Sequence, residues 1–282
     1  MILNPTIIDI RSSHVMAIVN LTPDSFYASS RHASHDAVRE SVVRAVSEGA
    51  TIVDLGGYSS RPGAEEVTVD EEWRRVEMGL QAVSDAEVGV VVSIDTFRSE
   101  IVRRAYEAYG PFIVNDISAG EADKDIIGVV AELGLPYVAM HMRGTPETMQ
   151  SLTEYEEGVT KGVVDYFRER VEVLMAAGIA PQNIILDPGF GFAKTTEQNF
   201  MLLAGLAALR DLGYPLLIGL SRKSMIYRPL GITPQEALPG SLALAWEALR
   251  GGEAIVRVHD VAATHQVVEL AKYYKRVGYD KG

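Results

Sequence analysis

The chain has 282 residues, of which 47% are hydrophobic, 23% are charged and 7% are aromatic, a balance typical of a folded globular protein. It has no cysteine, which excludes a disulfide framework, a cysteine nucleophile, a cysteine-ligated zinc site and an iron–sulfur cluster. Its formal net charge of −12 disfavours a nucleic-acid partner, because no basic excess is available to neutralise phosphates. A small anionic substrate remains compatible with this charge, since a few basic side chains can be focused in one pocket.

The sequence contains no signal for membrane insertion or export. No apolar run approaches the ~18 residues that are needed to cross a bilayer. Residues 1–14 lack both the basic segment and the long apolar segment of a secretory signal. We therefore expect no membrane partner, and we predict a cytoplasmic location.

Short apolar runs alternate with longer segments of helical periodicity along the whole chain. The predicted strands are 15–19, 51–55, 90–94, 112–114, 137–140, 184–186, 216–219 and 254–258. The predicted helices are 35–48, 71–84, 100–109, 125–133, 155–177, 197–209, 235–250 and 261–276. Such continuously apolar strands are typical of a parallel sheet that is buried on both faces.

Eight strand–helix units in a chain of this length favour a closed (β/α)8 TIM barrel over an open doubly wound sheet. We expect one α/β domain that spans residues 1–282. Residues 1–13 precede the first unit and are expected to form a short N-terminal hairpin, over 2–10, that plugs the bottom of the barrel.

Polar and glycine-rich segments follow the predicted strands and do not precede them. They lie at 20–26, 56–63, 95–96, 115–116, 141–144, 187–192, 221–224 and 259–260. In a (β/α)8 barrel these strand ends converge on one face, where active sites are built. The sequence therefore predicts that residues from the whole chain line one cavity.

Short acceptor side chains at three strand ends suit a flat heterocycle with several N–H donors. These are Asp95, Asn115 and Asp187, and Lys223 adds a donor for a ring nitrogen or carbonyl. The alternative is that each acceptor caps a helix, because Asp and Asn favour that position after a strand. A lysine and an arginine converging on all three favour a ligand site.

Basic side chains at other strand ends predict an anion site. Arg257 ends an apolar strand and should point into the barrel mouth, where a guanidinium favours a phosphate or carboxylate; Arg61 and His259 would join it. The alternatives are a structural ion pair of Arg257 with Asp54 or a neighbour, and a capping or core role for His259. Asn20 offers an oxygen to Mg²⁺, which often takes only one or two protein ligands beside substrate phosphates.

Other catalytic motifs are absent from the sequence. It contains no P-loop string, no His-Glu-x-x-His zinc motif and no Gly-x-Ser-x-Gly nucleophile motif. The methionines, Met140 among them, are expected in the core or in a pocket wall.

Seven motifs, taken in order, resemble those of the dihydropteroate synthase family, and the resemblance covers nearly the whole chain. They are VNLTPDSF at 19–26, DLGGYSSRPGA at 54–64, SIDT at 93–96, VNDI at 114–117, LDPGFGF at 186–192, GLSRKS at 219–224 and RVHD at 257–260. Two departures affect the first two loops. Tyr58 and Ser60 stand where the family usually has Glu and Thr, as in a subset of bacterial members, and residues 26–30 read FYASS.

The resemblance implies a transferase of folate biosynthesis, from a family that binds sulfonamides as substrate mimics. It would condense 6-hydroxymethyl-7,8-dihydropterin pyrophosphate with p-aminobenzoate and release pyrophosphate. The implied catalytic residues are Asp95, Lys223, Arg257, His259 and Arg61.

The resemblance also assigns residues to each substrate. The residues implied for the pterin are Asp95, Asn115, Asp187 and Lys223. Those implied for the pyrophosphate are Asn20 with Mg²⁺, Arg61, Arg257 and His259. Those implied for the p-aminobenzoate are Ser60, Arg61, Pro62, Phe26, Phe192 and Ser224. Met140 and Gly219 complete the expected substrate-binding set. Many family members are homodimers through the last helices, and residues 261–274 could serve here, although core packing explains them equally well.

Two other functions compete with this one. The first is a related pterin-binding barrel that presents methyltetrahydrofolate to a corrinoid protein, and it has no use for a pyrophosphate clamp. The second is a non-catalytic pterin-binding paralogue, against which the presence of Lys223, Arg257 and His259 argues.

Overall fold

Eight parallel strands lie side by side in one sheet, in the order β6-β5-β4-β3-β2-β1-β8-β7. The computed structural model describes residues 9–22, 35–58 and 67–278. An isolated parallel bridge between Leu186 and Leu216 joins the two outer strands, so the sheet closes into a barrel. The strands are β1 His14–Asn20, β2 Ile52–Gly56, β3 Val91–Asp95, β4 Ile113–Asp116, β5 Tyr137–Met140, β6 Ile184–Asp187, β7 Leu217–Ile218 and β8 Ile255–Val258.

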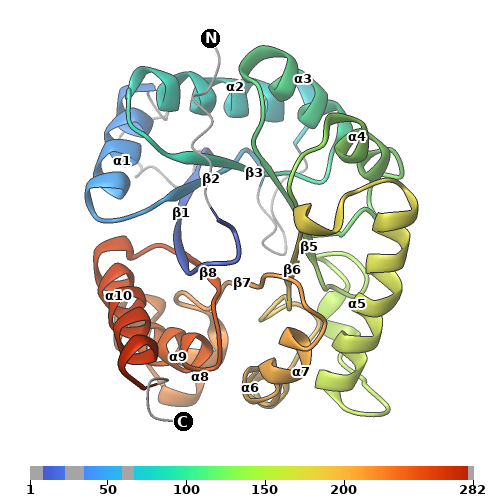
Figure 1. Ribbon diagram of the computed structural model, residues 1–282, viewed down its shortest axis with the longest axis vertical. Coiled ribbons are helices and arrows are strands. Elements are labelled where there is room, and N and C mark those ends of the chain that lie inside the picture. Colours follow the sequence, from blue (N-terminus) through green and yellow to red (C-terminus); the bar gives the residue numbers. More distant parts are fainter. Residues whose placement is uncertain (1–8, 23–34, 59–66, 279–282) are drawn as a thin grey trace.

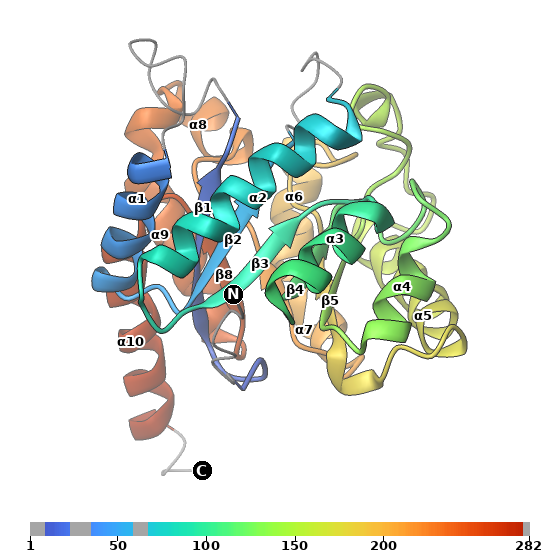
Figure 2. The ribbon, with the colours of Figure 1, turned by 90° about the horizontal axis from the view of Figure 1, so that it is seen from above.

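Helices surround the strands, as Figure 1 shows in a view along the barrel and Figure 2 from the side. They are α1 His35–Ser47, α2 Val69–Asp85, α3 Ser99–Tyr109, α4 Ile126–Leu133, α5 Val159–Ala176, α6 Thr196–Ala204, α7 Leu206–Arg210, α8 Ser224–Leu230, α9 Leu238–Arg250 and α10 Val261–Gly278. The (β/α)8 fold predicted from the alternating pattern is confirmed. No described helix is long and apolar enough to cross a membrane.

The predicted helix 197–209 is wrong as one element, because the chain divides there into α6 and α7 at Gly205. A Cβ atom at Gly205 would lie 2.6 Å from the side chain of Thr160, so the approach of this turn to α5 requires glycine. Glycine also weakens a helix interior, which explains the break.

Two further helix starts differ from the prediction. The segment 235–250 begins with a separate 3₁₀ turn, Pro234–Ala237, before α9, which carries Pro239 in its first turn. The segment 155–177 becomes helical only at Val159, after Gly158 adopts a positive φ of 86°. In both places a proline or glycine resets the backbone where hydrophobic periodicity alone would continue the helix.

The barrel interior is filled at the N-terminal end of the strands. One apolar cluster there comprises Met16, Ile52, Ile113, Val138, Ile185, Leu217 and Ile255. Ile10 packs against it from below, and residues 9–13 form a turn without a strand. The hairpin predicted over 2–10 lies almost wholly outside the described residues, so both the plug and the single domain over 1–282 stay predictions.

Candidate active site at the barrel mouth

The register of the strands aligns polar residues at their C-terminal ends. Asn20 on β1 pairs with Gly56 on β2, Gly56 pairs with Asp95 on β3, and Asp95 pairs with Asn115 on β4. A Cβ atom at Gly56 would lie 3.7 Å from Asn20 Oδ1 and 3.9 Å from Asp95 Oδ2. The side chains of Asn20 and Asp95, on the two strands that flank β2, therefore both lie beside Gly56.

Arg257 links two carboxylates across the barrel. Its Nε donates to Asp54 Oδ2 at 2.6 Å, and its Nη2 donates to Asp95 Oδ2 at 2.9 Å. Asp54 is fully buried and also accepts hydrogen bonds from Ser93 Oγ at 2.6 Å and Asn115 Nδ2 at 3.1 Å. The structure therefore contains the ion pair between Arg257 and Asp54 that was an alternative from the sequence. Arg257 also reaches the mouth, where it binds Asp95.

The network shifts the proton affinities of its members. Burial raises the pKa of Asp95 to about 7, against the effect of Arg257 and with help from the negative charge of Asp54. Burial alone would lower the pKa of Arg257, but Asp54 and Asp95 outweigh it and raise that pKa above its ordinary value. Arg257 is therefore a permanent cation, whereas Asp95 can change its protonation near neutral pH.

Asn115 and Asp187 extend this acceptor surface. Because the amide nitrogen of Asn115 is used on Asp54, its oxygen is left for a donor in the mouth. Asp187 Oδ1 accepts from the backbone N–H of Gly189 at 2.8 Å, and burial raises the pKa of this carboxyl while the charge of Lys223 opposes the rise. The acceptors therefore come from three different strands.

Lys223 follows β7 and lies near Asp187, two glycines and the ring of Phe192. Cβ atoms at Gly191 and Gly219 would lie 4.0 and 3.9 Å from its Nζ atom. The ammonium group donates to the carbonyl oxygen of Phe190 and lies 4.8 Å from the ring centroid of Phe192. Burial lowers the pKa of Lys223 to about 8, although Asp187 opposes that effect.

Apolar side chains form one wall beside these polar groups. Met140 is buried in a cluster with Ile117, Met142, Met149 and Ala193, against which Phe192 packs. This cluster agrees with the expectation that Met140 lies in the core or in a pocket wall. A flat ring could contact such a wall with its face while its edge meets the acceptors.

His259 lies at the end of β8, next to the loop that carries Lys223. Its Nδ1 atom is 3.0 Å from Ser221 Oγ, and its backbone N–H donates to the same oxygen at 3.2 Å. Arg222 forms a fork with both carboxylate oxygens of Asp260, at 2.8 and 2.7 Å. These bonds tie the two loops together, and they place His259 beside the Lys223 loop rather than in the core.

The helix-cap alternative for the three acceptor residues is wrong. The described N-caps of α3, α4 and α6 are Arg98, Asp125 and Thr195. Asp95 and Asp187 instead are the last residues of β3 and β6, and Asn115 is the next-to-last residue of β4. Ser224 is the first residue of α8. Four predicted site residues, Phe26, Ser60, Arg61 and Pro62, lie outside the described residues.

Several residues of the site were not predicted. Ser93 supports Asp54, and a buried pair, His141 and Lys194, lies behind the loop that contacts Lys223. For Lys194 the only signal in the sequence is a lysine within a loop of glycine, alanine and phenylalanine, GFGFAK at 189–194. The structure shows that this lysine is buried.

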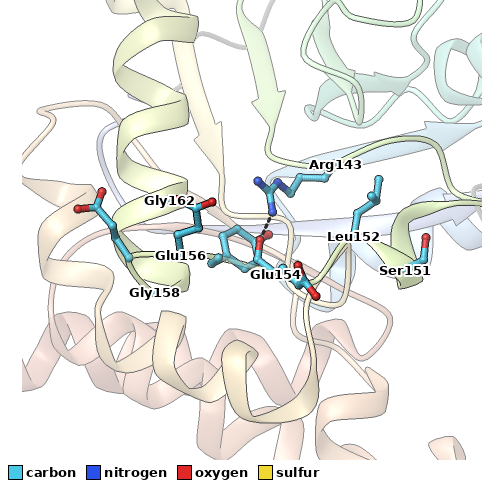
Figure 3. Close-up of a pocket in the computed structure, with 9 residues that line it drawn as sticks. Arg143, Ser151, Leu152, Glu154, Glu156, Gly158 and Gly162 are labelled. Atoms are coloured by element: carbon cyan, nitrogen blue, oxygen red, sulfur yellow. Dashed lines mark hydrogen bonds between the residues drawn. The ribbon is translucent and has the colours of Figure 1, made fainter.

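Two pockets are lined mainly by residues of the loops that follow the strands. One of about 630 Å³ is lined by Tyr58, Phe97, Ile117 and Met142 among others, and Tyr58 meets Phe97 edge-on with a centroid distance of 5.3 Å. The other, of about 540 Å³, is lined by Arg143 and several glutamates, and Figure 3 shows Arg143 reaching the backbone of Glu154. Neither pocket contains a predicted site residue.

The chain matches the family model described as pterin binding enzyme over residues 16–259. It is 42% identical to the dihydropteroate synthase of Escherichia coli K12 over 268 residues, which cover 95% of this chain and 93% of the relative. The Yersinia pestis dihydropteroate synthase, solved with a sulfonamide drug complex, superposes with a TM-score of 0.89 at 35% identity over 98% and 99% of the two chains.

The Xanthomonas albilineans enzyme has been solved in two informative states. The structure with 4-aminobenzoic acid gives a TM-score of 0.85 at 38% identity over 95% and 94% of the chains. The structure in complex with 7,8-dihydropteroate gives a TM-score of 0.83 at 35% identity over 95% of each chain. The chain therefore belongs to the pterin-binding enzyme family, in the branch of the dihydropteroate synthases.

Proposed function

We propose that this chain is a dihydropteroate synthase of folate biosynthesis. It joins 6-hydroxymethyl-7,8-dihydropterin pyrophosphate to p-aminobenzoate and releases 7,8-dihydropteroate and pyrophosphate. The observation that carries the proposal is the position of Arg257, which binds Asp95 and lies close enough to influence Asp187 and Lys223 electrostatically. Acceptors for a ring and cations for a pyrophosphate therefore share one mouth.

The acceptors would hold the pterin by its donor edge. Asp95, Asn115 and Asp187 each offer an oxygen from a different strand, and Lys223 would donate to a ring acceptor. When the bond between the pterin methylene carbon and the pyrophosphate oxygen breaks, positive charge develops on the ring. A carboxylate at Asp95 stabilises that charge, and the preorganised network needs little rearrangement to do so.

The cations would stabilise the departing pyrophosphate. Arg257, His259 and Arg61 are the proposed groups, and Arg257 keeps its charge at every relevant pH. The amine nitrogen of p-aminobenzoate attacks the methylene carbon and loses one proton as the new C–N bond forms. The amine is nucleophilic without activation, so the reaction needs no cysteine or serine nucleophile.

We propose that Mg²⁺ enters with the substrate. Asn20 supplies one side-chain oxygen at the mouth, and the described residues contain no group of three or more His, Cys, Asp or Glu that could hold a metal. This donor set fits an ion that is held mainly by phosphate oxygens, and it does not fit a metal bound by protein alone. When bound, Mg²⁺ would neutralise charge on the leaving pyrophosphate.

The p-aminobenzoate would occupy the outer part of the mouth. Phe192 and Ser224 are the described members of this proposed subsite, on the loop after β6 and at the start of α8. The ring of Phe192 packs over Lys223, so an aromatic substrate could stack there beside the pterin. Phe26, Ser60, Arg61 and Pro62 are proposed for the same subsite from the family resemblance alone.

We propose that two copies of the chain associate through α10. Leu270, Tyr273, Tyr274 and Val277 recur at helical spacing on this helix, and each exposes between 48% and 61% of its surface. Such a contiguous apolar face is larger than scattered surface residues require. Light scattering should give twice the mass of the chain, and Leu270→Glu should return it to the monomer mass.

We also propose a cytoplasmic location. The pyrophosphate ester carries several negative charges and cannot cross a bilayer unaided, so the enzyme would act where its substrate is made. Fractionation of cells that express the chain tests this location directly.

A turnover assay separates this function from its alternatives. With both substrates and Mg²⁺, the wild-type chain should release pyrophosphate, and Asp95→Asn or Lys223→Ala should abolish the product while the fold is retained. A barrel that serves a corrinoid methyl transfer would gain no thermal stability from Mg²⁺ with pyrophosphate. A non-catalytic paralogue would bind pterin and form no product, and either outcome would refute the proposal.

A further inference from the structure

Lys194 is a buried lysine whose three hydrogen-bond donors are all used. Only 4% of the residue is exposed, in the loop between β6 and α6. Its Nζ atom lies 3.0 Å from His141 Nδ1 and donates to the carbonyl oxygens of Gly189 at 3.0 Å and Phe192 at 2.9 Å. Burial lowers the pKa of Lys194 to about 7, and in the ammonium form each of its three N–H donors has one of these acceptors.

His141 is built to accept a hydrogen bond from this lysine. It follows β5, and the rings of Tyr155, Tyr166 and Phe167 surround its imidazole at centroid distances of 6.1, 4.9 and 6.4 Å. Burial, with the positive charge of Lys194 next, lowers the pKa of His141 well below its ordinary value. A neutral imidazole can leave Nδ1 free of a proton and accept there.

The two carbonyls that Lys194 binds belong to the same loop as the groups that contact Lys223. Phe190, which follows Gly189, accepts from Lys223 Nζ through its own carbonyl oxygen, and the ring of Phe192 lies 4.8 Å from that nitrogen. Gly189 has a positive φ of 66°, and a Cβ atom there would lie 2.0 Å from the carbonyl oxygen of His141. The loop is thus wrapped tightly around the lysine and pressed against the end of β5.

We propose that Lys194 is a positioning residue of the pterin pocket, which fixes the loop at 188–193 so that Phe190 and Phe192 hold Lys223 beside Asp187. The identity of the ligand as a pterin rests on the proposed function, whereas the anchoring of the loop rests on the contacts alone. Tyr155 supports the same loop from outside by donating to the carbonyl of Ala193 at 3.0 Å. Lys194 therefore acts on the substrate through Lys223 and does not contact it.

The test compares Lys194→Met with the wild type and with Lys161→Met. Methionine is an unbranched side chain one atom shorter than lysine, and it removes all three donors. Lys161 is an exposed lysine on α5, and its replacement by methionine removes the same functional group from the surface. Because all the hydrogen bonds that Lys194 makes to the loop and to His141 are lost, we expect pterin affinity to fall about tenfold or more, measured by calorimetry with 6-hydroxymethylpterin. Lys161→Met should stay within about twofold of the wild type.

Kinetics separate positioning from general destabilisation. A positioning role raises KM for the pterin pyrophosphate more than it lowers kcat. A merely structural role lowers the fraction of active enzyme, which reduces kcat and leaves KM unchanged. Hydrogen exchange of the substrate-free chain should increase in the peptide that covers 187–199 and stay unchanged in α9 and α10.

Unchanged pterin affinity, KM and loop exchange in Lys194→Met would overturn the proposal. If that variant does not fold, His141→Phe keeps a ring among the aromatic neighbours and removes one acceptor, and it should shift the same quantities in the same direction by a smaller factor. If the wild type itself binds no pterin, the proposed function fails, and loop exchange alone decides whether Lys194 anchors the loop.

Discussion

Replacing Arg257 with lysine keeps the positive charge and removes the fork that joins Asp54 to Asp95. The two bonds measure 2.6 and 2.9 Å, and a lysine ammonium cannot reproduce both in the same geometry. Because Asp54 is fully buried, we expect the ammonium to stay with it and the bond to Asp95 to be lost. One such bond to a charged group contributes about 1.5–3 kcal/mol.

This loss should appear in both stability and activity. At about 2 °C per kcal/mol for a domain of this size, Tm should fall by about 3–6 °C in calorimetry. The same free energy corresponds to a loss of about tenfold or more in kcat/KM, since Asp95 would no longer be aligned toward the substrate.

A matched control exists on the surface of α9. Arg250 forms a similar fork with Glu247, at 3.0 and 2.7 Å, but 56% of the arginine side chain and 45% of the glutamate side chain are exposed. Arg250→Lys should therefore shift Tm by less than about 2 °C. Equal effects of the two substitutions, or an unchanged Tm in Arg257→Lys, would show that the buried fork does not have the role assigned to it.

Three further predictions address the pH dependence, a buried ion pair and the metal. Because the pKa of Asp95 is raised to about 7, the folded chain binds more protons than the unfolded chain at every pH between the ordinary pKa of an aspartate and about 7. The contribution of Asp95 to stability should then fall as pH rises through this window. Over the same window kcat/KM should rise toward a plateau above about pH 7, and Asp54→Asn should move the midpoint of this rise to lower pH. Glu72→Gln should lower the unfolding free energy by about 3 kcal/mol in urea denaturation, because Arg98 Nη1 loses its buried partner at 2.9 Å; a change below about 1 kcal/mol would contradict this. Asn20→Ala should raise the Mg²⁺ concentration that gives half-maximal turnover, and an unchanged requirement would exclude Asn20 as a ligand.

The alternation of strands and helices was predictable because each element has a strong and distinct hydrophobic period. The predicted strands, however, ended before Asp95, Asn115 and Asp187, whereas the structure includes these residues in β3, β4 and β6. Polar residues at a barrel mouth continue the hydrogen-bond ladder although they interrupt the apolar pattern. Apolar patterning therefore underestimates strands where they enter a site.

The partners of the site residues were harder to predict than their positions. The sequence offered Arg257 either an ion pair or a substrate anion, and the structure shows that the ion pair with Asp54 also orients the side chain toward Asp95. Lys194 was missed because a single lysine in a loop normally faces solvent, and only the wrapping of the chain around it creates three acceptors.

The most direct test of the account is the stoichiometry of product formation. Purified chain should convert the pterin pyrophosphate and radiolabelled p-aminobenzoate into equal amounts of labelled dihydropteroate and pyrophosphate. It should release no pyrophosphate when either substrate is omitted, and Asp95→Asn should transfer no label. A folded wild-type chain that binds the pterin but transfers no label would contradict the assignment of acceptors and cations to one catalytic mouth.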